Sequence, residues 1–349
     1  MAYKVFIDGQ AGTTGLRLAE RLAGRADIEL AKIPGDKRKD IGARLSCIAE
    51  ADISVLCLPD DGAREIALAV DEAVEKGGPG SPLAKSRIID CSTAHRTAAG
   101  WVYGMPEIGK VDESAMRVSN PGCHATGYIM ALRPLVDAGI VDPGAAMCFF
   151  SLTGYSGGGK PMIAQYEAAA SGFAGEAPAP GNGGVPGLAD EAAAALPAAP
   201  RLYALSQGHK HIPEMREYSG LKEAPVFSPA VCGFYSGMLV CVPLPRSSLR
   251  RPAAAERIRE LLSLFYEGCP LVKVRPAGYE LAEAAGEGYL SAAAFSDRDD
   301  IEILVTGKDD KIEIVARYDN LGKGASGAAI QNMNLMLGLP ETRGLILGS

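Results

Sequence analysis

Cys123 stands in the stretch of the chain that is best suited to covalent chemistry. It follows Pro121 and Gly122, a pair typical of a sharp turn, and precedes a run with helical character over about 126–136. A cysteine at a helix N-terminus feels the positive end of the helix dipole, which favours the thiolate, the nucleophilic form of the side chain. The turn therefore predicts Cys123 as a nucleophile, although a cysteine taken alone is more often a core residue.

Two of the four histidines lie together in the run His209-Lys210-His211, which continues into Ile-Pro-Glu. An imidazole titrates near neutral pH, so both are candidates for the acid–base partner of Cys123, and the residues do not choose between them. No third ligand is suitably spaced to complete a metal site, and the eight cysteines contain no CxxC pair. We therefore predict no metal, and read the other seven cysteines as structural thiols of a reducing compartment.

A glycine-rich loop follows the first apolar run, 3–8, and leads into a helical run over 16–23. Strand, glycine loop and helix form the arrangement that holds a dinucleotide, because glycine permits close backbone approach and the helix N-terminus faces the pyrophosphate. The spacing is GxxGxxG rather than the commoner GxGxxG. The candidate cofactor residues here are Gly9, Gly12, Thr13, Thr14 and Gly15.

The second strand, 28–33, is followed by Pro-Gly-Asp-Lys-Arg-Lys. Asp36 would suit the ribose of NAD, but Lys37 and Arg38 favour the 2′-phosphate of NADP, and a solvated basic turn is the alternative. Strands over 53–58 and 87–90 end in Pro59 and Ser92. Ligands bind beyond the carboxyl ends of parallel strands, so both are candidate cofactor contacts.

Four further residues are candidate substrate contacts. Arg96 follows the fourth strand, and Asn120 lies in the turn before Cys123. Ser156 and Lys160 belong to a Gly/Ser loop whose backbone amides suit a phosphate or carboxylate.

The elements that must position these residues fall into two groups. Alternating strands and helices over 1–122 predict a parallel sheet of the Rossmann type. Strands over 147–152, 237–244, 290–295, 301–306 and 311–318, with a helix over 252–266 and a hairpin signal at 307–310, predict an α+β catalytic domain with a mixed or antiparallel sheet. Residues 171–200 are rich in Ala, Pro and Gly and indicate a surface excursion. The glycine-rich stretch 319–327 leads into a closing helix, 328–337.

Length and composition agree with this division. The chain has 349 residues, enough for two domains, and its net charge of -7 makes a nucleic-acid partner a poor expectation. It has neither a membrane-length apolar run nor a secretory leader pattern, so we expect a cytoplasmic protein with no membrane partner.

The motifs together resemble the N-acetyl-γ-glutamyl-phosphate reductases of arginine biosynthesis. The resemblance rests on residues 103–107, 119–123, 209–214 and 319–327, and residues 6–15 and 92–96 resemble the shorter, type 2 branch. It implies an NADP-binding Rossmann domain formed by 1–122 and 323–349, and a catalytic and dimerisation domain formed by 123–322. It also implies that Cys123 is the nucleophile, that Asn320, Lys323 and Gly324 lie near the nicotinamide, and that the protein is a homo-oligomer, dimer or tetramer.

The implied reaction begins with attack of Cys123 on a small acyl phosphate, followed by reduction of the resulting thioester to an aldehyde. Two departures stand out: the family usually has an aromatic residue and then Pro after the cysteine, where this chain has His124-Ala125, and the chain is somewhat longer than the type 2 pattern. Two alternatives stay open. One is a reductase acting on aspartyl phosphate, and the other is a non-catalytic NADP-binding regulator.

Overall fold

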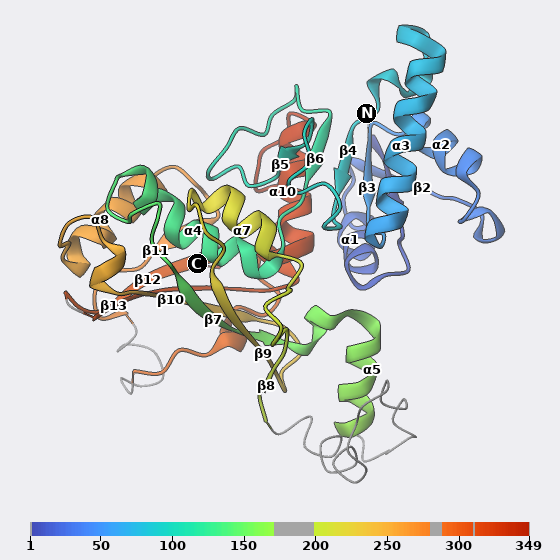
Figure 1. Cartoon of the computed structure of the whole chain (residues 1–349). Coiled ribbons are helices and arrows are strands. Elements are labelled where there is room, and N and C mark those ends of the chain that lie inside the picture. Colours follow the sequence, from blue (N-terminus) through green and yellow to red (C-terminus); the bar gives the residue numbers. More distant parts are fainter. Residues whose placement is uncertain (1, 171–198, 280–287, 310, 349) are drawn as a thin grey trace.

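The computed structural model describes residues 2–170, 199–279, 288–309 and 311–348. They form two β-sheets flanked by helices, with the N-terminal sheet on one side of the molecule and the second sheet on the other (Figure 1). Within these ranges no helix is both long and apolar enough to cross a membrane. The surface excursion expected over 171–200 falls almost wholly outside them.

The N-terminal sheet has six strands, all parallel, in the order β2-β1-β3-β4-β6-β5. The chain passes from β1 to β2 on one side and then to β3 on the other, so the loops after β1 and β3 meet where the strand order reverses, the usual ligand position in such sheets. The strands are β1 (Tyr3–Asp8), β2 (Ile28–Ala31), β3 (Ile53–Leu56), β4 (Ile88–Asp90), β5 (Val102–Tyr103) and β6 (Arg117–Ser119).

Helices cover both faces of this sheet. α2 (Ile41–Glu50) and α3 (Asp60–Gly77) share one apolar cluster with it, and α1 (Thr13–Ala23) shares the other with α10 (Gly327–Met336). The last helix of the chain therefore packs on the first sheet, and Figure 1 shows it beside β5 and β6. This packing places the glycine-rich residues before α10 between the two sheets. The domain division at 122 and 323 itself remains a prediction.

The second sheet has seven strands in the order β11-β12-β13-β10-β7-β9-β8. It is mixed, as expected, because β7 and β9 are parallel, as are β11 and β12, while the other pairs are antiparallel. Its strands are β7 (Cys148–Gly154), β8 (Arg201–Leu202), β9 (Val226–Cys232), β10 (Met238–Leu244), β11 (Val272–Val274), β12 (Ile301–Lys308) and β13 (Lys311–Tyr318), and its helices are α4 (Cys123–Asp137), α5 (Gly159–Ala170), α7 (Ile212–Ser219) and α8 (Ala255–Phe265).

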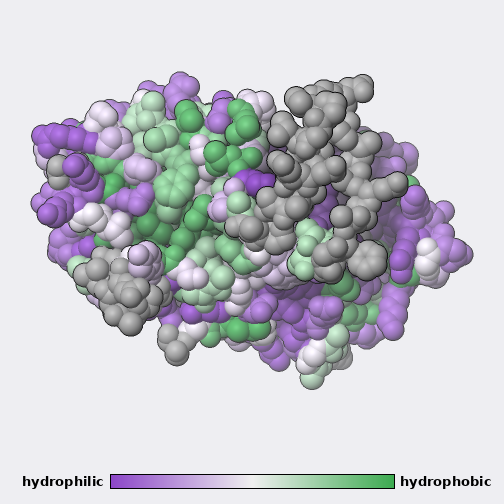
Figure 2. Space-filling view, turned by 90° about the horizontal axis from the view of Figure 1, so that it is seen from below, coloured by the Kyte–Doolittle hydropathy of each residue, from purple (hydrophilic) through white to green (hydrophobic). Residues whose placement is uncertain are grey.

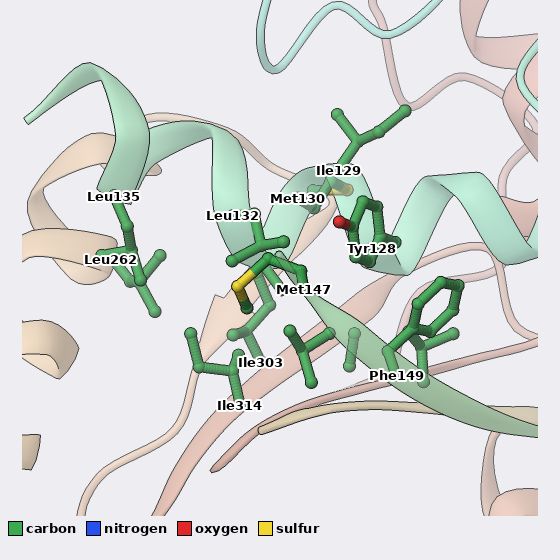
Figure 3. Close-up of a cluster of buried hydrophobic side chains, with 14 of the residues drawn as sticks. Tyr128, Ile129, Met130, Leu132, Leu135, Met147, Phe149, Leu262, Ile303 and Ile314 are labelled. Atoms are coloured by element: carbon green, nitrogen blue, oxygen red, sulfur yellow. The ribbon is translucent and has the colours of Figure 1, made fainter. Parts of the chain in front are cut away.

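The main core lies between this sheet and helix α4. Tyr128 and Leu132 of α4 face Phe149 of β7 and Ile314 of β13, and Leu262 of α8 closes the side of the cluster (Figure 3). Burial of such side chains contributes about 1.5–3 kcal/mol each relative to exposure. The first residue of α4 is Cys123, so this core fixes the helix that carries the candidate nucleophile.

The strand expected over 290–295 is wrong. Residues Ala292–Phe295 form a 3-10 turn instead. They cross the start of β10 so closely that a Cβ on Gly237 would lie 2.2 Å from the carbonyl oxygen of Ala292. The turn packs against the sheet rather than within it, because three successive alanines give neither the alternation nor the bulk of a strand.

Buried ion pairs join α1 to the second sheet. Arg17 donates to Asp319, 3.0 Å away, and Arg21, one turn later, donates to Asp299. Both carboxylates are buried, so breaking either pair leaves an uncompensated charge. The helix that follows the glycine loop is therefore held against the residues that lead into α10.

Candidate active site

Cys123 is the first residue of α4 and lies directly after the turn that ends β6. The helix begins three residues earlier than the sequence indicates, which confirms the expected position of the cysteine at a helix N-terminus. Its outer side is closed by the π-helical turn Gly322–Ser326, because a Cβ on Gly324 would lie 2.9 Å from the Cβ of Cys123. Only glycine permits this approach, and π-turns are frequent at functional sites.

A buried carboxylate holds the turn before the cysteine. Glu214 of α7 accepts hydrogen bonds from Arg96 at 2.6 Å, from the hydroxyl of Tyr103 at 2.7 Å and from the backbone N–H of Gly122 at 3.0 Å. All three donors point at one carboxylate that is 1% exposed. A charge this deeply buried requires such compensation, and the arrangement fixes where the chain enters α4.

The two candidate histidines differ in their surroundings. His209 is half-buried, and its Nδ1 accepts the backbone N–H of His211 at 3.2 Å. That bond leaves the proton of the neutral ring on Nε2. His211 is buried and its Nδ1 has no partner among the described residues. Burial lowers the pKa of His209 to about 4, and burial together with Arg96 lowers the pKa of His211 well below its usual value.

His124, whose role the sequence left open, is a buried residue with both ring nitrogens partnered. Its Nδ1 lies 2.8 Å from the hydroxyl of Ser151, and its Nε2 lies 2.6 Å from the hydroxyl of Tyr203. Burial lowers its pKa well below the usual value, so the ring is neutral. His124 thus links α4 to β7, and both of its ring nitrogens are already hydrogen-bonded.

The thiol itself is not the stabilised thiolate that the helix N-terminus favours. Burial raises the pKa of Cys123 to about 11, against the lowering effects of Arg96, the backbone N–H of His124 and Lys210. The free energy of solvation that a thiolate loses on burial is larger than its favourable interaction with the positive end of the helix. The neutral thiol is therefore favoured. The expectation of a lowered pKa is corrected here, because Cys123 is mainly a neutral thiol near neutral pH.

This pKa has a direct kinetic consequence. Only the thiolate is alkylated, so we expect the rate of Cys123 alkylation by iodoacetamide to rise about tenfold per pH unit from pH 7 to pH 10. The rate is followed by mass spectrometry of the Cys123 peptide, with the exposed Cys148 as the internal comparison. A plateau for Cys123 near neutral pH would contradict a thiol that is neutral at that pH.

A single cavity of about 370 Å³ brings most of the predicted chemistry together. It lies between the glycine loop, the start of α4, the histidine run and the residues before α10. The predicted residues that line it are Thr13, Thr14, Arg96, Asn120, Cys123, Ser156, His209, His211, Asn320 and Gly324. Asn320 donates to Ser156 at 3.1 Å and accepts from the N–H of Gly237 at 2.9 Å, so its amide orientation is fixed.

Other predicted residues lie outside this cavity. Lys160 is exposed on α5, and the ammonium of Lys323 is buried between Glu107 and Gln331, each 2.6 Å away. A cofactor contact by Lys323 would have to come from its backbone. The hydroxyl of Ser92 is bonded to Asp90 at 2.8 Å. Pro59, Lys37 and Arg38 follow β3 and β2 at the carboxyl edge of the first sheet, and the two basic residues are exposed.

Two functional candidates escaped the sequence analysis. Lys210 lines the cavity between the histidines, yet among the described residues no carboxylate forms an ion pair with it. Glu214 is the buried carboxylate that holds the turn before Cys123. Both stand inside the histidine run, so the signal was present. Lys210 could have been recognised from the sequence, because it stands between two histidines. Glu214 could be recognised only from the fold, since its partners are more than ninety residues away.

The glycine loop fits a dinucleotide phosphate. Gly9 has φ +85°, and a Cβ there would lie 2.3 Å from the carbonyl oxygen of Cys57. A Cβ on Gly15 would lie 2.5 Å from the carbonyl oxygen of Gly9, so the loop is closed tightly over the helix start. The hydroxyl of Thr13, at the first turn of α1, is buried without a partner among the described residues. An unpaired donor at a helix N-terminus suits a phosphate oxygen. The described residues hold no cluster suited to a metal.

Known proteins resemble both the fold and the sequence. The model of the semialdehyde dehydrogenase dimerisation domain matches residues 123–176 and 180–320. Aspartate semialdehyde dehydrogenase II of Vibrio cholerae superposes with a TM-score of 0.66 at 15% identity, covering 97% of this chain and 99% of that one. The enzyme from Francisella tularensis gives 0.63 at 16% identity, covering 95% and 99%. These likenesses establish the two-sheet fold.

Other relatives share a larger fraction of identical residues with this chain. N-acetyl-gamma-glutamyl-phosphate reductase 2 of Nostoc sp. is 41% identical over 98% of this chain and 99% of its own length. The reductase of Sinorhizobium medicae is 41% identical over 97% and 99%, and reductase 2 of Pseudomonas putida is 36% identical over 97% and 98%. With this identity over nearly its whole length, and with its cysteine, histidine and glycine motifs gathered at one cavity, the chain belongs to the family of N-acetyl-γ-glutamyl-phosphate reductases.

Proposed function

We propose that the protein reduces N-acetyl-γ-glutamyl phosphate to N-acetylglutamate semialdehyde in arginine biosynthesis, with release of phosphate. The observation that carries this proposal is the single cavity in which a helix-terminal cysteine, two histidines and the first turn of a dinucleotide-type helix meet. A non-catalytic regulator would not need this convergence of a thiol and two imidazoles.

Cys123 is the nucleophile of the proposed mechanism. A neighbouring base removes the thiol proton, the thiolate attacks the γ-carbonyl, and phosphate leaves to give a thioester. When bound, NADPH supplies the hydride that reduces the thioester carbonyl. The oxygen of the resulting thiohemiacetal takes up the proton that the base removed from Cys123, and the cavity retains this intermediate until the base removes the proton again and Cys123 leaves as the thiolate. The N–H groups at the start of α4, where Cys123 stands, are the donors that would support the oxygen as it gains charge.

His209 is the histidine to which we assign the proton transfers. It lines the cavity, its ring is oriented by the N–H of His211, and it is the less buried of the two. His211 instead packs on the turn before the cysteine, since its Nε2 lies 2.6 Å from where a Cβ of Gly122 would stand. General acid–base help of this kind is worth about 10²–10⁴-fold in rate.

The decisive assay is run in the reverse direction. N-acetylglutamate semialdehyde, NADP and phosphate should give phosphate-dependent NADPH formation, and aspartate semialdehyde should give much less. A preference for aspartate semialdehyde would mean that the substrate is aspartyl phosphate. If neither aldehyde is oxidised while NADP still binds, the protein is a regulator.

Lys210 binds the anionic part of the substrate. The charge of Arg96 is neutralised by Glu214, whereas Lys210 reaches the same cavity with no ion-pair partner among the described residues. We expect Lys210→Ala to raise KM for the acyl phosphate by about 10–100-fold with a smaller change in kcat, because a charge-assisted hydrogen bond is lost. Steady-state kinetics on Lys160→Ala is the matched comparison. A rise in KM for Lys160→Ala alone would mean that Lys160, and not Lys210, binds the anionic part of the substrate.

NADP is the cofactor that the basic residues after β2 support. Lys37 and Arg38 are exposed at the end of the sheet where a ribose phosphate would lie, and neither forms an ion pair with another described residue. We expect the double variant Lys37→Ala, Arg38→Ala to raise KM for NADPH about tenfold and to leave KM for NADH nearly unchanged. Equal effects on both cofactors would mean that the pair does not read the 2′-phosphate.

We infer self-association through the second sheet. Its lower face is apolar (Figure 2), and the outward residues Phe150 of β7 and Val226 of β9 are 41% and 59% exposed. Both lie within the span matched by the dimerisation-domain model. A face of this kind is typical of a surface that a second copy covers.

A further inference from the structure

Two thiols lie side by side at the carboxyl edge of the first sheet. β3 and β4 are parallel, with Leu56 paired to Asp90, so the next residues, Cys57 and Cys91, continue the same register. The backbone N–H of Cys91 donates to the carbonyl oxygen of Leu56 at 2.9 Å, which shows that the ladder extends to this point.

Both side chains point to the same face of the sheet, because both pack against the cluster that contains α1 and α10. Both are free thiols and half-buried. A hydrogen bond with Cys57, followed by burial, raises the pKa of Cys91 well above the usual value. Neighbouring residues in register on adjacent strands have Cα atoms about 5 Å apart, which is inside the range that a disulfide spans.

The pair is connected to the site on both sides. The carbonyl oxygen of Cys57 lies against Gly9, where a Cβ would approach it to 2.3 Å, and its N–H donates to the oxygen of Asp8 at 2.7 Å. Cys91 lines the cavity. A covalent bond between the two sulfurs would therefore act on the glycine loop and on the cavity wall together.

We propose that Cys57 and Cys91 form a reversible disulfide under peroxide, and that this bond distorts the glycine loop and weakens cofactor binding. The second half rests on the proposed function, since it takes NADPH as the ligand of that loop. Neither thiol has a part in the reductase chemistry, which uses Cys123.

The chemistry balances in two steps. The Cys57 thiolate attacks one oxygen of hydrogen peroxide, the O–O bond breaks, and a sulfenic acid and one water result. The Cys91 thiolate then attacks the sulfur of Cys57, which releases the second water and forms the S–S bond. Two thiols lose two electrons and two protons, and one peroxide is reduced to two waters. Because the Cys91 pKa is raised, the second step is faster at alkaline pH.

The experiment uses the full-length protein carrying Cys123→Ser, so that oxidation of the nucleophile does not interfere. Hydrogen peroxide at one to five equivalents is added, and peptide mass spectrometry detects a Cys57–Cys91 cross-link that has lost two hydrogens. NADPH binding is measured by fluorescence before oxidation, after it, and after dithiothreitol. We expect the cross-link, a loss of affinity of about tenfold, equivalent to one lost charge-assisted contact, and full recovery on reduction.

The matched control adds Cys57→Ser to Cys123→Ser, and its affinity for NADPH should not respond to peroxide. Should that protein fail to fold, Cys241 and Cys269 in the parent protein report whether unrelated thiols react at the same rate. Absence of the cross-link, or a cross-link without loss of affinity, overturns the proposal. If the reduced protein does not bind NADPH, the cofactor assignment is wrong. Mass spectrometry still tests in that case whether the disulfide forms.

Discussion

Replacing Cys123 by serine is expected to lower kcat for acyl-phosphate reduction by at least about 10³-fold. A serine hydroxyl ionises far less readily than a thiol, and this site already raises the pKa of Cys123 to about 11. A serine ester is also a poorer hydride acceptor than a thioester. The measurement is NADPH oxidation with the acyl phosphate, together with the phosphate-dependent reverse reaction.

The control for this variant is Cys148→Ser. Cys148 is an exposed free cysteine at the start of β7, and its replacement should leave the rate unchanged. NADPH binding and the unfolding midpoint of Cys123→Ser should match the parent protein, since the serine fits the same space. A Cys123→Ser enzyme with near-normal kcat would rule out a covalent thioester.

The second large effect is expected at Gly122. Its backbone is extended, at φ -78° and ψ 146°, so alanine is compatible with the conformation. The added Cβ, however, would lie 2.5 Å from Arg96 Nη1, 2.5 Å from Glu214 Oε1 and 2.6 Å from His211 Nε2. These groups form the buried brace before Cys123, and they have little room to move. We expect Gly122→Ala to lower kcat/KM about 100-fold, because small displacements of a nucleophile cost that much.

A loss of stability of about 1–3 kcal/mol should accompany it, measured by denaturant unfolding, as is usual for overpacking a filled interior. Gly109→Ala is the matched variant, since nothing lies within 4 Å of a Cβ at Gly109. It should leave both rate and stability near those of the parent. Normal kinetics in Gly122→Ala would mean that the brace does not set the position of the thiol.

Local patterns were enough to predict the fold class and the position of Cys123 at the start of a helix. The alternation of strands and helices specified the parallel sheet, and the turn Pro121-Gly122 specified the start of α4, because turn chemistry acts over a few residues. The second sheet was predicted only in part. Strands β7, β10, β12 and β13 were expected, whereas β8, β9 and β11 were not. The strand expected over 290–295 is a turn, because a short apolar run does not distinguish the two.

Roles that depend on partners far away in the chain could not be predicted from local sequence patterns. Lys323 looked like a cofactor contact, but its ammonium is bound to Glu107, which is 216 residues away. Arg96 looked like a free anion ligand, but Glu214 neutralises it across 118 residues. Lys210 was not predicted as an anion-binding residue for the same reason, because a charge without an ion-pair partner is recognised only when its neighbours are known. The low pKa expected for Cys123 failed because local sequence reports the helix end and not the burial.

The return of α10 to the first sheet sets an order for assembly during synthesis. About 200 residues separate Gly122 from Lys323, and at about 5–20 residues per second their translation takes roughly 10–40 s. Throughout that interval the apolar face that Ile330 and Met333 later cover is open, and Cys123 lacks the Gly324 wall. The nascent N-terminal half thus carries an uncovered apolar sheet face and an unshielded thiol until α10 is synthesised.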